Sequence, residues 1–175
     1  GVYHADQAQI VFLDTPGFHK PKHRLNEFMM KAALNTLEEI DAVLYLTEAE
    51  SKIGPGDRYI LDCLGDVNTP VILGINKIDL VPQREALLPV IESYSQAYNF
   101  AEIVPISALE DENIASLLDT LLSYLPEGPQ YYPEDMVTDQ PERFIAAELI
   151  REKVLHATRE EIPYSIAVVV DQMKT

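Results

Sequence analysis

Short apolar runs alternate with helical patterns through most of this 175-residue chain. The clearest runs are residues 9–13, 71–75 and 101–106. Residues 114–125 carry leucine and isoleucine at helical spacing, which predicts an amphipathic helix. Strands that alternate with helices indicate an α/β fold, with a mostly parallel sheet and helices on both of its faces. Such sheets bind ligands beyond the carboxyl ends of their strands, so the residues after each run are the first candidates for a site.

Several smaller elements are expected from the same patterns. Residues 1–4 and 9–13 predict an antiparallel hairpin at one edge of the sheet. Asp57 follows a Gly-Pro-Gly turn and is expected to cap a helix, and Pro82 is expected to open the next one. The other expected elements are a strand at 42–46, helices at 26–38 and through 144–157, and a last strand at 165–170.

A polar motif follows the run at 71–75. Its sequence is Asn76-Lys77-Ile78-Asp79. The carboxylate of Asp79 can accept two parallel hydrogen bonds from the ring N–H and the exocyclic amine of guanine, and charge-assisted pairs of this kind are strong. Adenine has no such pair of donors. Asn76 and the stem of Lys77 can flank the base, so the motif indicates guanine recognition.

A second motif, Asp14-Thr15-Pro16-Gly17, follows the run at 9–13. In a phosphate site, Asp14 can hold Mg²⁺ through its water shell. Gly17 lets a backbone N–H approach a terminal phosphate, because glycine has no Cβ to clash. A tight turn is the alternative explanation of this composition. The position upstream of the guanine motif favours the phosphate site.

A third motif, Ser107-Ala108, follows the run at 101–106. Two small residues permit close approach, so a backbone N–H here can contact the carbonyl oxygen of guanine. An ordinary helix entry at Ser107 is the alternative. Phe18 stands where many GTP hydrolases have a glutamine that orients water, so no catalytic residue is predicted and slow intrinsic turnover is expected. A core residue at this position is the alternative. The basic segment 18–24 is a candidate switch, or else a solvated loop.

Composition restricts the partners. Thirteen basic and 29 acidic residues give a net charge of −16, so the average field does not attract nucleic acid. Any RNA contact is therefore expected from a local basic patch or from sequence outside this chain. The single cysteine, Cys63, has no neighbouring ligands at metal spacing. No apolar stretch is long enough for a membrane-spanning helix, and no signal peptide is expected.

The three motifs, in this order, resemble the third, fourth and fifth motifs of GTP-binding proteins. The whole chain resembles the Era family, bacterial GTPases of small-ribosomal-subunit assembly. Residues 14–25 are the most specific segment and are similar to the second switch of that family over its full length. Residues 54–57 and 141–153 also match, and the latter looks like the entry to a type-2 KH domain.

The resemblance implies a P-loop-GTPase-like fold and a GTP/GDP switch that uses Mg²⁺. It further implies docking on 16S rRNA and the 30S subunit, no DNA partner, and a cytoplasmic location with peripheral association at the inner membrane. The nucleotide-binding residues that it implies are Asp14, Thr15, Pro16, Gly17, Asn76, Lys77, Asp79, Ser107 and Ala108. Among these, Asp14 is the expected Mg²⁺ contact.

Some family parts have no counterpart in the sequence. It contains neither a Gly-x-x-x-x-Gly-Lys-Ser/Thr phosphate loop nor a Gly-x-x-Gly loop. We therefore expect a GTPase domain at 1–125 that lacks its N-terminal strand, phosphate loop and first switch. A linker at 126–138 and the start of an α+β type-2 KH domain at 139–175 are expected to follow. GTP hydrolysis is expected of the complete protein and is left open for this chain alone.

Two alternatives remain at this point. A related GTPase of tRNA modification or tandem-domain ribosome assembly would share the guanine motif. It would lack the basic second switch followed by this linker and helix. A catalytically inert interaction module is the other alternative, because a chain without a phosphate loop loses most phosphate contacts. A phosphate loop upstream of Gly1 would reject the inert module.

Overall fold

The computed structural model describes residues 1–6, 8–13, 40–49, 53–65, 67–138, 140–157 and 167–171. These residues belong to two compact units. One unit runs from Leu13 to Pro129, and the other combines Gly1–Phe12 with Gln130–Thr175. The predicted helix at 26–38 lies outside the described residues. The domain boundaries expected from the sequence remain predictions.

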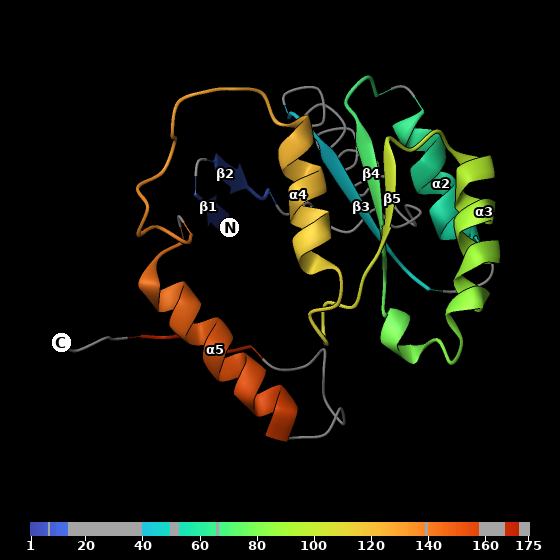
Figure 1. Ribbon diagram of the computed structural model, residues 1–175. Coiled ribbons are helices and arrows are strands. Elements are labelled where there is room, and N and C mark those ends of the chain that lie inside the picture. The colour runs from blue at the N-terminus through green and yellow to red at the C-terminus, as the bar shows by residue number, and fades with distance from the viewer. Residues whose placement is uncertain are drawn as a thin grey trace. The chain divides into compact units, whose positions relative to one another are not determined.

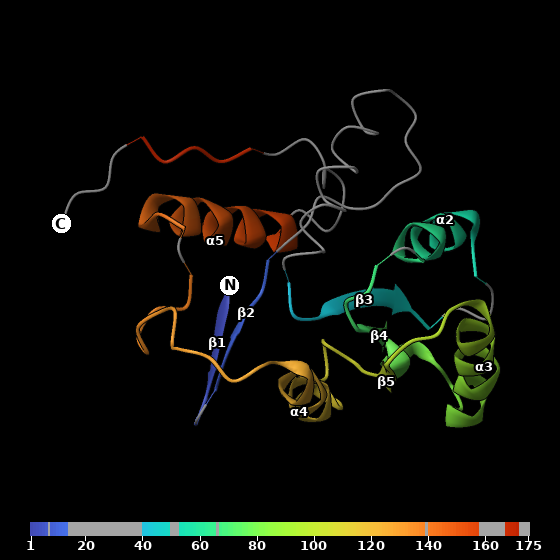
Figure 2. The ribbon, with the colours of Figure 1, turned by 90° about the horizontal axis from the view of Figure 1, so that it is seen from above.

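The unit of residues 13–129 is built on a parallel sheet (Figure 1). Its three described strands lie in the order β3-β4-β5 and are all parallel. The strands are β3 (Val43–Glu48), β4 (Val71–Asn76) and β5 (Glu102–Pro105). The α-helices are α2 (Pro55–Leu64), α3 (Leu87–Ala97) and α4 (Ile114–Tyr124). Figures 1 and 2 show α2 and α3 on one face of the sheet and α4 on the other, which confirms the predicted α/β class.

The core is densest around β4, the central strand. Five consecutive residues, 71–75, are buried, because helices cover both faces of the sheet. Leu73 and Ile75 are fully buried in a cluster with residues of α2 and α3. Gly74 faces the other side, where a Cβ would lie 2.6 Å from a methyl carbon of Leu46. The missing side chain thus leaves room for Leu46 to cover the middle of the strand.

The start of α2 differs from the sequence expectation. The helix begins at Pro55 and its N-cap residue is Gly54, so Asp57 caps the helix from the third helical position and not from the N-cap itself. Its carboxylate accepts hydrogen bonds from the Gly54 N–H (2.9 Å) and the Tyr45 hydroxyl (2.6 Å). Proline suits the first helical position, which moves the start earlier. Burial, and then the bond to Asp57, raises the pKa of Tyr45 above its ordinary value.

Asp57→Ala is expected to destabilise the folded protein by about 2 kcal/mol. The variant loses a helix-capping bond, worth about 1 kcal/mol, and leaves the buried Tyr45 hydroxyl without its acceptor. Asp62→Ala is the matched control, since Asp62 is an exposed residue of the same helix. Urea unfolding measures both, and the control is expected within about 0.5 kcal/mol of wild type. Equal losses in the two variants would contradict the role given to Asp57.

Two other expectations were wrong in detail. Pro82 does not open the next helix; a 3₁₀ turn, η2 (Arg84–Ala86), precedes α3, which begins at Leu87. Residues 167–171, within and just after the predicted last strand, have no strand structure. A strand needs a hydrogen-bonded neighbour, and none is found for these residues among the described part of the chain.

The second unit contains β1 (Val2–Ala5), β2 (Ala8–Val11) and α5 (Glu142–Ala157). The predicted antiparallel hairpin is confirmed, with Val2 opposite Val11. Among the described residues, β1 and β2 form a two-stranded sheet. The hairpin also binds residues 131–137: the Val2 N–H donates to the Val137 carbonyl at 2.9 Å. Its expected place at an edge of the parallel sheet stays a prediction.

The side chain of Gln9 makes the most contacts between β2 and that later segment. Its amide nitrogen donates to the Tyr132 carbonyl at 2.8 Å. Its amide oxygen accepts from the backbone N–H groups of Tyr131 (3.2 Å) and Tyr132 (3.1 Å). On the neighbouring strand, a ring nitrogen of His4 lies 2.9 Å from the Met136 carbonyl. One amide group therefore serves three backbone groups more than 120 residues away in the chain.

Candidate functional site

The candidate site lies at the carboxyl ends of β4 and β5. Asn76 is the last residue of β4, and a 3₁₀ turn, η1 (Ile78–Leu80), holds Asp79. The Ile78 N–H donates to the Ile106 carbonyl at 3.2 Å, which ties this turn to the end of β5. The Ala49 N–H donates to the Asn76 carbonyl at 3.0 Å, which ties it to the end of β3. The motif is therefore fixed on both sides by its neighbours in the sheet.

The side chain of Asn76 joins two of the predicted motifs. Its Oδ1 accepts hydrogen bonds from the backbone N–H of Lys77 (2.8 Å) and from that of Ala108 (3.0 Å). In place of Asn76, an aspartate would bring a negative charge and a hydrophobic residue would have no acceptor atom. Asn76 therefore sets the spacing between the loop after β4 and the loop after β5.

Ser107 makes the second link between these loops. It is fully buried, and its hydroxyl donates to Asp79 Oδ1 at 2.5 Å. The same hydroxyl accepts the Glu110 N–H at 3.1 Å. Ser107 and Glu112 exchange backbone hydrogen bonds of 3.0 Å, which closes the loop between them. The buried Ser107 hydroxyl, which makes two hydrogen bonds, thus holds the Asp79 carboxylate in one orientation.

Lys77 has an unusual backbone and a charged partner. Its φ of 64° and ψ of 35° place it in the left-handed region, which costs a residue with a side chain about 1–2 kcal/mol. Its ammonium forms an ion pair with Glu48, the last residue of β3. Glu48 belongs to none of the predicted motifs. The only available signal was a carboxylate at the end of the strand next to the motif.

Further contacts, not predicted from the sequence, stabilise the loop after β5. The side-chain amide of Asn113 donates to the Pro105 carbonyl at 2.9 Å. Asp111 and Asn113 both have positive φ angles, 56° and 61°, which Asp and Asn tolerate better than most residues. Glu112 forms an ion pair with Arg84 of η2. These contacts give the loop a defined shape without a glycine.

The structure therefore brings together five of the predicted site residues: Asn76, Lys77, Asp79, Ser107 and Ala108. The other predicted residues lie outside the described part of the chain: Asp14, Thr15, Pro16, Gly17 and Phe18. Among the residues that are described, no group of three or more His, Cys, Asp or Glu side chains could hold a metal ion. The described half of the site is thus the half expected to meet the base.

The geometry suits a guanine edge. Asp79 is exposed, and the bond from Ser107 uses one lone pair of Oδ1 only. A carboxylate has about four acceptor positions, so both oxygens can still accept a hydrogen bond from a ligand. A rigid carboxylate that presents two parallel acceptors matches the two donors on the Watson–Crick edge of guanine. The residues present therefore fit the base that the motif predicted.

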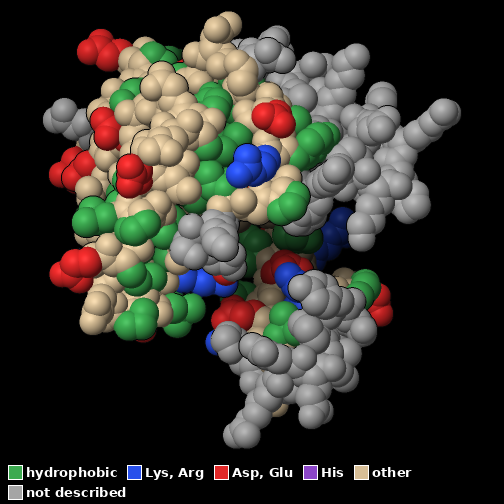
Figure 3. Space-filling view, turned by 90° about the vertical axis from the view of Figure 1, so that its right-hand side faces the viewer, with side chains coloured by type: hydrophobic (Ala, Val, Ile, Leu, Met, Phe, Trp, Pro, Cys, Tyr) green, Lys and Arg blue, Asp and Glu red, His purple; other side chains and the backbone are tan. Residues whose placement is uncertain are grey.

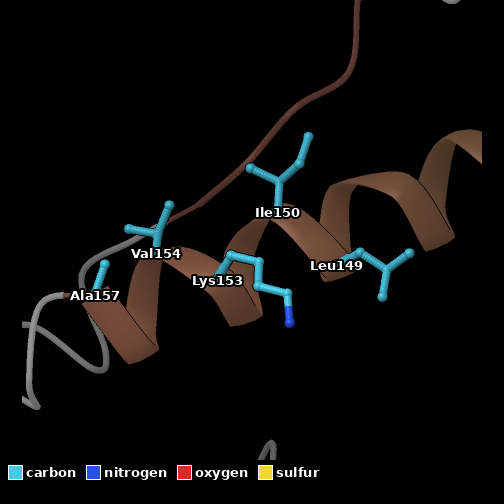
Figure 4. Close-up of a pocket in the computed structure, with 5 residues that line it drawn as sticks. All are labelled: Leu149, Ile150, Lys153, Val154 and Ala157. Carbon is cyan, nitrogen blue, oxygen red and sulfur yellow. The ribbon is translucent and has the colours of Figure 1, made fainter.

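The second unit has a hollow of a different character (Figure 4). All of its lining residues come from α5, and Lys153 is the one charged side chain among them. The lining residues are Leu149, Ile150, Lys153, Val154 and Ala157. It offers no convergent polar groups, so it does not meet the usual description of a small-molecule site.

Across the described residues, no helix combines the length and apolar character needed to cross a membrane.

Comparison with known proteins agrees with this geometry. The family described as the elongation factor Tu GTP binding domain matches residues 2–127. A crystal structure of Era in complex with MgGDPNP and nucleotides 1506–1542 of 16S ribosomal RNA is 44% identical, with a TM-score of 0.85. The match covers 99% of this chain and 59% of that one.

A variant of Era from Aquifex aeolicus bound to GDP·AlF4⁻ is also 44% identical, with a TM-score of 0.82. That match covers 97% of this chain and 58% of the other. The elongation factor SelB of Methanococcus maripaludis, at 20% identity and a TM-score of 0.54, shares the fold over 70% of this chain and 26% of its own. This chain thus spans somewhat more than half the length of the two Era chains. It belongs to the family of elongation factor Tu GTP-binding domains, and nearly all of it is similar to Era.

Proposed function

We propose that the full-length protein to which this chain belongs binds GTP and GDP with Mg²⁺ and hydrolyses GTP as a molecular switch. The proposal is carried by two hydrogen bonds that join the loops at the ends of two parallel strands, from Ser107 to Asp79 and from the Ala108 N–H to Asn76. Similar Era chains hold MgGDPNP and GDP·AlF4⁻, which supports the same nucleotides here.

The described residues have distinct roles in this proposal. Asp79 accepts the two donors of the guanine edge, and Ser107 holds its carboxylate in place. The stem of Lys77 lies along the base. Asn76 sets the distance between the two loops through its two backbone bonds. Asp14 contacts Mg²⁺ through water and Gly17 meets the terminal phosphate, both as inferred from the sequence.

We also propose that the full-length protein binds 16S rRNA, acts on the 30S subunit during its assembly, and resides in the cytoplasm with peripheral association at the inner membrane. The similar Era chain in complex with nucleotides of 16S rRNA supports the RNA contact. Figure 3 shows Asp and Glu side chains dispersed over the face that carries α2 and α3, so this face does not resemble an RNA-binding surface. We assign the proposed RNA contact to the KH domain, of which residues 139–175 are the expected first part.

Calorimetric titration of the full-length protein with Mg·GDP, and with Mg·ADP as control, tests the nucleotide proposal. We expect GDP to bind at least about 100-fold more tightly than ADP, because a site built to hydrogen-bond one base leaves buried polar groups unpaired with another. Equal binding of the two nucleotides, or no binding of either, would reject guanine recognition by this site.

A further inference from the structure

Glu48 and Lys77 form an ion pair at the candidate site. Their side chains are 54% and 48% exposed, so the pair lies at the surface and not in the core. Glu48 belongs to none of the three motifs that the sequence analysis identified. The pair thus links a residue outside the motifs to the one residue of the guanine motif whose long side chain has most freedom to move.

The sheet itself places the two residues side by side. In the parallel pairing of β3 with β4, Glu48 lies opposite Asn76, the residue before Lys77. The hydrogen bond from the Ala49 N–H to the Asn76 carbonyl (3.0 Å) fixes the end of β3 at this level. The left-handed backbone of Lys77 then sets the direction in which its side chain leaves the strand. Two independent backbone constraints therefore bring the carboxylate and the ammonium together.

We propose that Glu48 is a positioning residue for the guanine site: its carboxylate holds the Lys77 side chain in the orientation that flanks the base. This inference rests on the proposed function. A lysine side chain that is free in solution loses rotamer entropy when a ligand fixes it. Where an ion pair has already restricted that freedom, the ligand has less entropy to lose, which is the general basis of preorganisation.

The sign of the expected effect separates this role from simple charge. Nucleoside diphosphates are anions, so removing a nearby carboxylate should by itself strengthen their binding. Removing a positioning residue should weaken it. Weaker binding after neutralisation of Glu48 is therefore opposite to the effect of the change in net charge. It cannot come from long-range electrostatics.

The test measures Mg·GDP affinity of the full-length protein by calorimetry. We expect Glu48→Gln to weaken GDP binding about three- to fivefold, which is the upper part of the range for an exposed ion pair. The loss should shrink in about 0.5 M NaCl, where screening weakens exposed pairs. Glu102→Gln is the matched control: Glu102 is exposed and begins β5, at the other end of the sheet. Its affinity should equal that of wild type.

A double-mutant cycle isolates the partner. Lys77→Met keeps an unbranched stem but has no ammonium, so adding Glu48→Gln to it should cause no further loss. Two results would overturn the positioning role and leave guanine recognition intact. One is that Glu48→Gln binds GDP as tightly as Glu102→Gln does. The other is that Glu48→Gln causes the same loss of GDP affinity, about three- to fivefold, in the Lys77→Met background. A wild-type protein that does not prefer GDP to ADP would instead reject the proposed function, and this inference with it.

Discussion

Asp79→Asn is expected to lower the affinity of the full-length protein for GDP by about 100-fold and to raise its affinity for xanthosine diphosphate. The asparagine amide has one acceptor and one donor, so it repels one of the two donors on guanine. Breaking one partner of a hydrogen-bonded charged contact costs about 2–5 kcal/mol, which corresponds to a factor of about 30 or more. Xanthine has a carbonyl in place of the exocyclic amine, so it accepts the new N–H.

Asp111→Asn provides the control for this exchange. Asp111 is exposed, lies in the loop after β5, and has a positive φ that asparagine also tolerates. The substitution makes the same change of carboxylate to amide near the site, and GDP affinity should stay at the wild-type level. Titration of both variants with GDP and xanthosine diphosphate checks the assignment. Unchanged GDP affinity in Asp79→Asn would show that another residue reads the base.

Leu73→Ala is expected to destabilise the protein by about 3–5 kcal/mol. Leu73 is fully buried at the centre of β4, with residues of α2 and α3 packed against the same face. Replacement by alanine loses the transfer free energy of the buried carbons and leaves a cavity that rigid neighbours on a central strand fill poorly. Because β4 delivers Asn76 to the site, nucleotide affinity should fall together with stability near the unfolding midpoint.

The control for this core substitution is Leu88→Ala. Leu88 lies on α3 with 65% of its surface exposed, so the same change in side chain should alter stability by less than about 0.5 kcal/mol. Urea unfolding followed by circular dichroism gives both values. A loss of similar size in the two variants would mean that burial in β4 is not what makes Leu73 important.

The sequence predicted the parallel sheet and the position of the guanine motif because both depend on local patterns. An uninterrupted apolar run at 71–75 is typical of a strand buried on both faces, and the structure has that strand. Strands of one parallel sheet end at the same edge, so Asp79 and Ser107 were expected near each other, and a hydrogen bond of 2.5 Å joins them. Their roles toward a nucleotide remain predictions.

What the sequence did not predict depends on backbone angles and on contacts distant in the chain. No local pattern indicates that Lys77 adopts a left-handed conformation or that its partner is Glu48, 29 residues earlier. Helix α2 begins earlier than expected, because Pro55 and Gly56, which suggested a turn, also suit the first turn of a helix. The contact of the hairpin with residues 131–137 was not predicted either, because strand alternation does not specify which distant segment binds a strand.

The contacts of Gln9 also bear on the order in which the chain folds during synthesis. Its amide binds the backbone of Tyr132, 123 residues later, so these bonds cannot form until that residue has left the ribosome. At about 5–20 residues per second, the interval is of the order of ten seconds. The strands and helices of residues 43–124 meet across shorter separations and can pack in the meantime. β2 therefore reaches these partners after β4 has met β3 and β5, and a nascent-chain series should protect β4 before β2.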